Sequence, residues 1–410
     1  MLSLLILSIV SLSALVAGTE PVASCEIQDE LRFYNDGSES FLVGDAAGTI
    51  GIYESGVIPI DEPLLVFSAS KLVAGVLLMR LVERGVVDIH DKVSDYLKWW
   101  TIDPEDPRSY VELYHLITQT AIFGENPCSM DTVNTTTLEC SREIYSNDYG
   151  VFRDVLGNVY NTPTLAQEKQ SALDPVAIAP GDYFFYSESH FVLLGQVLSQ
   201  ITNMTWGELF FQEIATPSGM DLDESDAPFY VFASPTHVDP GAGLFLSGLN
   251  YGKFLQAYMA GNLVNETTMA FMESPHTLSA TGVDTFFTAF PKDHSWAKVA
   301  KYGIGCWIVC DTEDCSGRRV VHSTGAGGFL PWMDRSNSDH PYWGIIVQYK
   351  ANFESREMSD WGEEQSMALF GELLPWLDAL TEEEWVDNCG DDDLNVNDAA
   401  GDGLYQGRNM

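Results

Sequence analysis

The chain has 410 residues, of which 45% are hydrophobic and 12% aromatic, enough to bury one large core or two smaller ones. Its 60 acidic residues outnumber the 20 Lys and Arg residues and give a formal net charge of -40. This excess repels nucleic-acid phosphates and anionic membrane surfaces. The composition therefore indicates a globular protein for which nucleic acid is not an expected partner.

The first 18 residues, MLSLLILSIVSLSALVAG, are predicted to be a cleaved secretory signal peptide. The run is apolar, ends in small residues and is short for a membrane span. Because no Lys or Arg stands near Met1, a retained membrane anchor is the alternative. No second apolar segment has spanning length. We therefore expect a secreted, extracellular protein without an integral span in its mature chain.

Three acceptor tripeptides for N-glycosylation fit export, at Asn134, Asn203 and Asn265. Among the seven cysteines, two pairs are close in sequence: Cys128 with Cys140, and Cys310 with Cys315. In an oxidising compartment these pairs are disulfide candidates. Cys25 and Cys389 could join the chain ends and leave Cys306 free, although sequence does not fix connectivity. The CDTEDC spacing is poor for zinc, and we expect neither metal nor cofactor.

The predicted elements change in type along the chain. GTIGIYESG, residues 48–56, predicts a strand and a turn, and residues 68–85 predict a helix that is apolar on nearly every face and therefore interior. Helices broken by Pro-, Gly- and Asn-rich loops follow to about residue 240. YGIGCWIVC, RRVVHSTG and YWGIIVQYK predict late strands, and EEQSMALFGELLPWL a last helix. This order indicates one α/β layer interrupted by a helical subdomain over about residues 80–240.

Ser68 and Lys71 open the interior helix three residues apart, which places both side chains on one face. A lysine kept at the start of an apolar helix can serve as a base for a neighbouring serine, because burial favours the neutral amine. The same spacing occurs at Ser295 and Lys298, without an apolar helix after it. The spacing alone is thus a weak signal, and its helical context favours Ser68.

Further motifs follow Ser68-Ala69-Ser70-Lys71 in order: HLITQTA at 115–121, PGDYFFYSESHFVLLGQVL from Pro180 with Tyr186, Ser187 and Glu188, GLFLSGLNYGKFLQAYMAGN from Gly243, and VVHSTGAGGF with His322, Ser323, Thr324 and Gly325. The ordered set resembles the serine β-lactamase and penicillin-binding protein superfamily, on the side of the class C β-lactamases and their esterase-like relatives. In that family the motifs read Ser-x-x-Lys, Tyr-x-Asn and Lys-Thr-Gly. The resemblance covers about residues 40–380.

The resemblance implies a fold of the β-lactamase/DD-peptidase type, an antiparallel sheet flanked by helices with an inserted all-helical subdomain, for a domain over residues 26–388. It implies a serine hydrolase that cleaves a small-molecule ester or amide through an acyl-enzyme. Ser68 would be the nucleophile, and Lys71 and Tyr186 would move its proton. The N–H groups of Ser68 and Ala326 would hold the oxyanion, and Ser323, Thr324 and Gly325 would line the substrate.

Two departures from the family pattern concern charge. Glu188 stands where the family has Asn, and a carboxylate there would hold Lys71 but raise its pKa. Ser323 stands where class C enzymes have a lysine that helps to bind the carboxylate of β-lactams, so a neutral ester is favoured over an antibiotic. Since a histidine often replaces this lysine in the esterase-like members, His322, one residue earlier, is a candidate substitute.

The last 22 residues, 389–410, form an acidic tail that is predicted to be disordered. Asp393, Asn395 and Asn397 alternate as in a calcium loop, but the loop glycine and closing glutamate of an EF-hand are missing. Two functions remain open from the sequence. One is the secreted serine hydrolase, and the other is a catalytically impaired relative that binds a peptide or a glycan in the old cleft.

Overall fold

The computed structural model describes residues 39–54, 57–124, 128, 136–147, 151–153, 159–161, 179–223, 228–229, 238–277, 299–336, 340–350 and 363–379. Its centre is a seven-stranded sheet in the order β2-β1-β11-β10-β9-β8-β7, in which all neighbouring strands are antiparallel. The strands are β1 (Ser40–Gly44), β2 (Thr49–Tyr53), β7 (Val299–Tyr302), β8 (Trp307–Cys310), β9 (Arg319–His322), β10 (Leu330–Asp334) and β11 (Tyr342–Val347). This arrangement confirms the predicted fold class.

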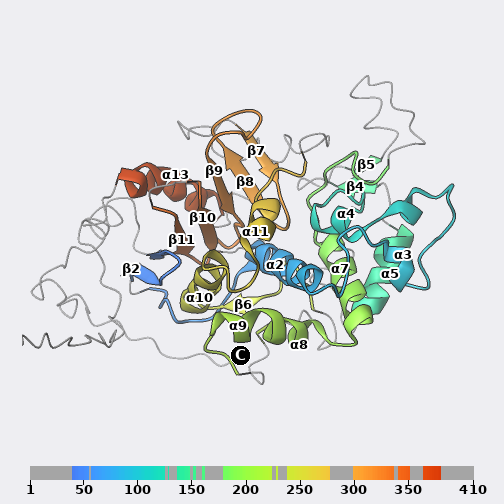
Figure 1. The fold of residues 1–410 in the computed structure, drawn as a ribbon, viewed down its shortest axis with the longest axis horizontal. Coiled ribbons are helices and arrows are strands. Elements are labelled where there is room, and N and C mark those ends of the chain that lie inside the picture. The colour runs from blue at the N-terminus through green and yellow to red at the C-terminus, as the bar shows by residue number, and fades with distance from the viewer. Residues whose placement is uncertain are drawn as a thin grey trace, which may run out of the picture.

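Helices cover both faces of the sheet and build the inserted region (Figure 1). The longer ones are α2 (Ser70–Glu83), α5 (Thr137–Asn147), α7 (Glu188–Thr202), α10 (Gly248–Met259), α11 (Glu266–Met272) and α13 (Glu363–Ala379). The shorter ones are η1 (Phe67–Ala69), α3 (Val93–Tyr96), η2 (Pro107–Tyr110), α4 (Leu113–Ile117), α8 (Trp206–Phe210), η3 (Phe211–Ala215, of π type) and α9 (Thr216–Ser218).

The alternation of side chains along β9 separates two hydrophobic cores. Val320 packs with Trp332 and Phe370 in the core beneath α13. Val321 belongs to the larger core on the other face, which contains α2 and α10. The sheet is therefore a middle layer, with α13 above it and α2, α10 and α11 below it in Figure 1.

Helix α2 runs through the larger core, as its uniformly apolar sequence predicts. Eleven of its 14 residues are buried, from Ser70 to Leu81. A continuous apolar surface of this kind stabilises the fold by roughly 25 cal/mol for each Å² removed from water. The helix that carries the Ser68 and Lys71 motif is thus held on all sides before any substrate binds.

The region inserted between the early and late strands contains α3, α4, α5, α7 and α8, which gather on the right of Figure 1. We expected this region to be all-helical, and that expectation is wrong. The strands β4 (Val151–Arg153) and β5 (Val159–Asn161) pair as an antiparallel hairpin within it. A second small sheet joins β3 (Leu64–Leu65) to β6 (Phe245–Leu246). This pairing brings the segment before Ser68 to the segment before α10.

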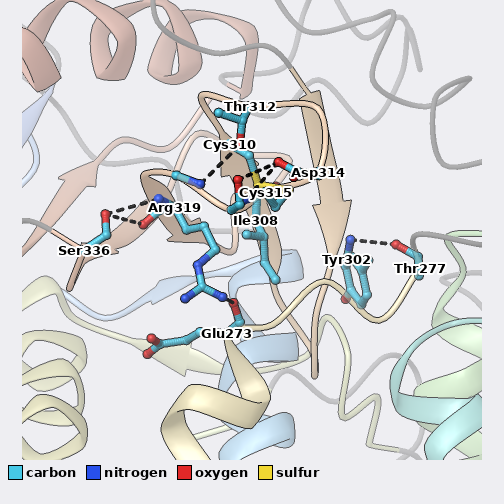
Figure 2. The surroundings of a disulfide bond; sticks show 12 residues. Glu273, Thr277, Tyr302, Ile308, Cys310, Thr312, Asp314, Cys315, Arg319 and Ser336 are labelled. Carbon is cyan, nitrogen blue, oxygen red and sulfur yellow. Dashed lines mark hydrogen bonds between the residues drawn. A yellow bond between two sulfur atoms is a disulfide. The ribbon is translucent and has the colours of Figure 1, made fainter.

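Both predicted short-range disulfides are present, between Cys128 and Cys140 and between Cys310 and Cys315. Figure 2 shows the second bridge closing the turn between β8 and β9, where Arg319 reaches the Glu273 carbonyl. Cys306 is free and buried, while Cys25 and Cys389 lie outside the described residues.

Two of the three predicted glycosylation positions, Asn203 and Asn265, are exposed, while Asn134 is not among the described residues. The signal-like segment 1–18 and the tail 389–410 also lie outside them. None of the described helices has the length and apolarity that a bilayer crossing requires.

Candidate active site

Ser68 lies in the 3-10 turn η1, directly before α2. The preceding residue, Phe67, has a φ of 46°, a left-handed conformation that is unusual for a bulky side chain. Its ring stacks on Tyr349 at 6.2 Å and lies against Gly327. These contacts hold a strained backbone in place, and strain of this kind is often found where a functional side chain must be presented.

Lys71 lies one helical turn after Ser68, and its side chain is fully buried. Its Nζ lies 3.0 Å from Ser68 Oγ, 3.3 Å from Glu188 Oε1 and 3.1 Å from the Gly241 carbonyl oxygen. An ammonium has three N–H donors, so each of them has an acceptor. The predicted pair of Ser68 and Lys71 is therefore in direct hydrogen-bond contact.

The surroundings of Lys71 favour its charged form. Burial lowers the pKa of this amine, but its electrostatic interactions with the acidic groups of Tyr186, Glu188 and Asp239 outweigh burial and raise the pKa above its ordinary value of 10.5. The expectation that burial makes the Lys71 amine neutral is wrong, because acidic neighbours are buried with it. Lys71 in the resting protein is an ammonium that donates to Ser68.

Tyr186 covers the ammonium from the side of the inserted region. Lys71 Nζ lies 4.6 Å from the centre of the Tyr186 ring, which is a cation–π contact. Tyr186 stacks on Trp307 at 5.4 Å and meets Tyr302 edge-on at 6.1 Å. The phenol is therefore held by Tyr302 of β7 and Trp307 of β8 next to Lys71.

Glu188 is the first residue of α7, and Ser187 caps that helix by accepting the N–H of Ser189. Burial would raise the pKa of the Glu188 carboxyl, but Lys71 and the N–H groups of the helix start lower it overall. About a third of its side chain, 34%, is exposed. The Glu188 carboxylate thus contacts Lys71, as predicted.

Asp239 is a site residue that the sequence did not reveal. It is buried, and its Oδ1 accepts the Gly241 N–H at 2.8 Å, which orients the carbonyl that binds Lys71. Burial and the neighbouring Glu188 raise the pKa of this carboxyl to about 7. Asp239 lies in HVDPGAG, and an Asp before Pro-Gly is typical of an ordinary turn. Because the chain has 60 acidic residues, the sequence gave no signal that this one belongs to the site.

The Gly-rich turn after β9 packs against the segment that carries Ser68. Ser323 Oγ donates to the Ser68 carbonyl at 2.8 Å, and a side chain at Gly325 would collide with the Val66 carbonyl. Ala326 follows in this turn, and within the described residues its N–H has no acceptor. The Ser68 N–H is at a helix start, where the amide is unused by the helix. Both predicted oxyanion donors thus belong to segments in contact.

His322 and Thr324 do not face Ser68, contrary to our expectation. Residues 320, 322 and 324 point to the α13 side of the sheet, and His322 lies 6.1 Å from the Phe370 ring. The His322 Nδ1 and Thr324 Oγ1 atoms are 2.9 Å apart, and both side chains are buried. His322 therefore cannot replace the missing strand lysine, because it is its neighbour Ser323 that faces Ser68.

Comparison with known families places this site in a known context. The β-lactamase family model matches residues 41–366, which span from β1 to α13. The chain belongs to the β-lactamase family. The motifs on which the resemblance rested, from Ser68 to Gly325, all lie within the matched residues.

Solved structures of β-lactamase-related proteins share the fold. A putative β-lactamase from Bacteroides dorei is 16% identical with a TM-score of 0.61, and the match covers 88% of this chain and all (100%) of that one. A hydrolase with promiscuous acyltransferase activity, EstCE1, is 15% identical with a TM-score of 0.58, covering 83% and 97%. Simvastatin synthase from Aspergillus terreus is 15% identical with a TM-score of 0.51, covering 84% and 97%. At these identities the likeness concerns the fold. No curated protein sequence matches the chain.

Proposed function

We propose that the protein is a secreted serine hydrolase that cleaves a neutral ester or amide through an acyl-enzyme on Ser68. The observation that carries the proposal is the contact between Ser68 Oγ and Lys71 Nζ at 3.0 Å, beside Tyr186, in a chain of the β-lactamase family. A nucleophile, a proton carrier and two candidate oxyanion donors are thus assembled at the start of one buried helix.

In the proposed reaction, the Lys71–Tyr186 pair first loses one proton to solvent, because an ammonium beside a neutral phenol has no site that accepts one. Ser68 Oγ then attacks the substrate carbonyl, and the deprotonated pair takes the hydroxyl proton. The N–H groups of Ser68 and Ala326 stabilise the oxyanion. The pair then returns the proton to the leaving alcohol or amine, which departs and leaves an acyl ester on Ser68. Water then attacks this ester while the pair accepts a proton from the water. The pair passes this proton to Ser68 Oγ as the carboxylic acid is released.

The preference for a neutral substrate rests on the charges around Ser68. Ser323 stands at the position of the family's cation, and its hydroxyl is directed to the Ser68 carbonyl. Glu188 is partly exposed at the site, and the whole chain carries a net charge of -40. A carboxylate on the substrate would therefore meet a negative field, which disfavours acidic β-lactams.

Labelling with a fluorophosphonate probe tests the proposal. We expect a mass adduct on Ser68, and hydrolysis of short p-nitrophenyl esters that falls by orders of magnitude in Ser68→Ala. Nitrocefin, which carries a carboxylate, should be a much poorer substrate than the esters. Folded protein without an adduct would contradict the hydrolase.

The second candidate is a peptide- or glycan-binding module in the same cleft. It is favoured by one observation, the raised pKa of Lys71 in a cage of three acceptors, which makes this lysine a poor base near neutrality. Binding without probe labelling would support this alternative.

Secretion is proposed from the first 18 residues, and it predicts a mature chain that begins near residue 19 with glycan at one or more of Asn134, Asn203 and Asn265. Intact-mass analysis of protein collected from the medium, before and after deglycosylation, tests both parts. An unprocessed N-terminus in membrane-bound protein would favour the anchor.

A further inference from the structure

Gln119 lies in the loop after α4 and is fully buried. Its φ of 58° is left-handed, an uncommon conformation for a residue with a long side chain. A backbone of this kind persists only where its surroundings hold it in place. In this conformation Gln119 forms hydrogen bonds with the backbone next to Tyr186.

Gln119 binds the peptide groups on both sides of Tyr186. Its carbonyl oxygen accepts the Phe185 N–H at 3.0 Å, and its side-chain Oε1 accepts the Ser187 N–H at 2.5 Å. The Ser187 hydroxyl in turn donates to the Gly124 carbonyl, further along the same loop. One buried residue therefore fixes the backbone immediately before and immediately after the phenol.

The same side chain also reaches the ring that supports Tyr186. The Gln119 amide lies close enough to the Tyr302 hydroxyl to influence its pKa, although the two groups form no hydrogen bond within the described residues. The ring of Tyr302 meets the Tyr186 ring edge-on at 6.1 Å, and Tyr302 is fully buried on β7. Gln119 thus lies beside the strand against which Tyr186 packs.

We propose that Gln119 is the positioning residue of Tyr186, holding the phenol at the distance from Lys71 and Ser68 that proton transfer requires. The inference rests on the proposed function, in which Tyr186 moves the serine proton. Within the described residues Gln119 has no hydrogen bond to Ser68 or Lys71, so it acts through Tyr186. A misplacement of about 1 Å at a reacting group reduces rates by about 100-fold.

The first experiment replaces the Gln119 side chain without changing its length. Gln119→Met removes the acceptor for Ser187 and leaves the backbone carbonyl in place. We expect kcat/KM for p-nitrophenyl esters to fall about 10- to 100-fold. Gln119→Glu, which keeps an acceptor oxygen, should recover part of this loss. Gln256→Met is the matched control, because within the described residues the side chain of this α10 glutamine donates only to the carbonyl of the exposed Ala47, between β1 and β2.

A double-substitution cycle separates positioning from general damage to the fold. If Gln119 acts through the phenol, Gln119→Met should cause no further loss when Tyr186 is already Phe. An equal factor of loss in both backgrounds would overturn the inference, as would unchanged kcat/KM in Gln119→Met. If the methionine variant does not fold, Gln119→Gly serves instead, because glycine adopts the left-handed backbone without strain.

A spectroscopic measurement keeps the inference testable should the hydrolase proposal itself fail. In protein with ring-labelled tyrosine, the signal that disappears in Tyr186→Phe belongs to Tyr186. Gln119→Met should shift this signal while Gln256→Met leaves it unchanged. An unshifted Tyr186 signal would refute the positioning role even in a protein without esterase activity, whereas a shifted signal without Ser68 labelling would refute the hydrolase alone.

Discussion

Replacing Glu188 with glutamine removes the charge beside Lys71 and keeps a side chain of the same length. Glu188 Oε1 lies 3.3 Å from the ammonium, and Lys71 is fully buried, while 34% of the Glu188 side chain is exposed. The ion pair stabilises the ammonium, the form that cannot accept a proton. Glu188→Gln should therefore make the Lys71–Tyr186 pair a better base near neutral pH.

The size of the effect follows from the distance and the exposure. Two unit charges 3.3 Å apart attract by about 5 kcal/mol at an effective dielectric constant of 20. Solvent at the exposed side of Glu188 screens part of this energy. Opposite charges at such distances change a pKa by roughly one to three units. Loss of a negative charge lowers the pKa of an amine and of a phenol alike, so the sign holds whichever group takes the proton.

The assay is a profile of kcat/KM for a p-nitrophenyl ester over about pH 5 to 10, with Ser68→Ala as the blank. The rising limb should move to lower pH by roughly one to three units in Glu188→Gln. Glu143→Gln is the matched control, because this exposed residue of α5 changes the net charge by the same amount far from the site. Tyr186→Phe should lower the rate across the whole profile.

The outcome that refutes the reasoning is a Glu188→Gln profile that superimposes on the parent profile. It would mean that the carboxylate turns to solvent in the working enzyme and does not control the protonation of Lys71. A shift in the opposite direction would mean that the ammonium is the active form and that the ion pair is needed to keep it charged.

Three further predictions address the rest of the site and the fold. Gly325→Ala should lower kcat/KM by about 100-fold, because the added methyl group would collide with the Val66 carbonyl, two residues before Ser68. Gly207→Ala is the control and should leave activity unchanged, because the space around Gly207 is open. The pKa of Asp239 rises from 3.8 to about 7 in the folded protein, so the folded state keeps a proton that the unfolded chain releases, and stability should fall as pH increases between these values. Asp239→Asn should flatten that dependence in thermal-denaturation scans, and an unchanged slope would contradict it. Cys128→Ser should lower the free energy of unfolding by about 3 kcal/mol through loss of the bridge that closes a 12-residue separation, and chemical denaturation of the parent with and without reductant checks the value.

Much of the fold was accessible from the sequence because its signals are local. The uniformly apolar run after Ser68 predicted an interior helix, and the three late β-rich runs predicted strands where β8, β9 and β11 lie. The spacing of Ser68 and Lys71 placed two side chains on one helical face, and the two cysteine pairs followed from short separations. These features depend on residues a few positions apart, where backbone geometry alone brings the groups together.

The protonation and the orientation of the site were decided by tertiary structure. Lys71 keeps its charge because Glu188, which is 117 residues away, and Asp239 surround it in the folded chain. His322 turns away from the site because its strand pairs between β8 and β10, which sends alternate side chains to the α13 face. Gln119 reaches the backbone on both sides of Tyr186 only after the loop following α4 has packed on the start of α7. Electrostatic energies and hydrogen bonds depend on distances between side chains, and for residues far apart in the chain these distances exist only once the layers of the fold have packed together.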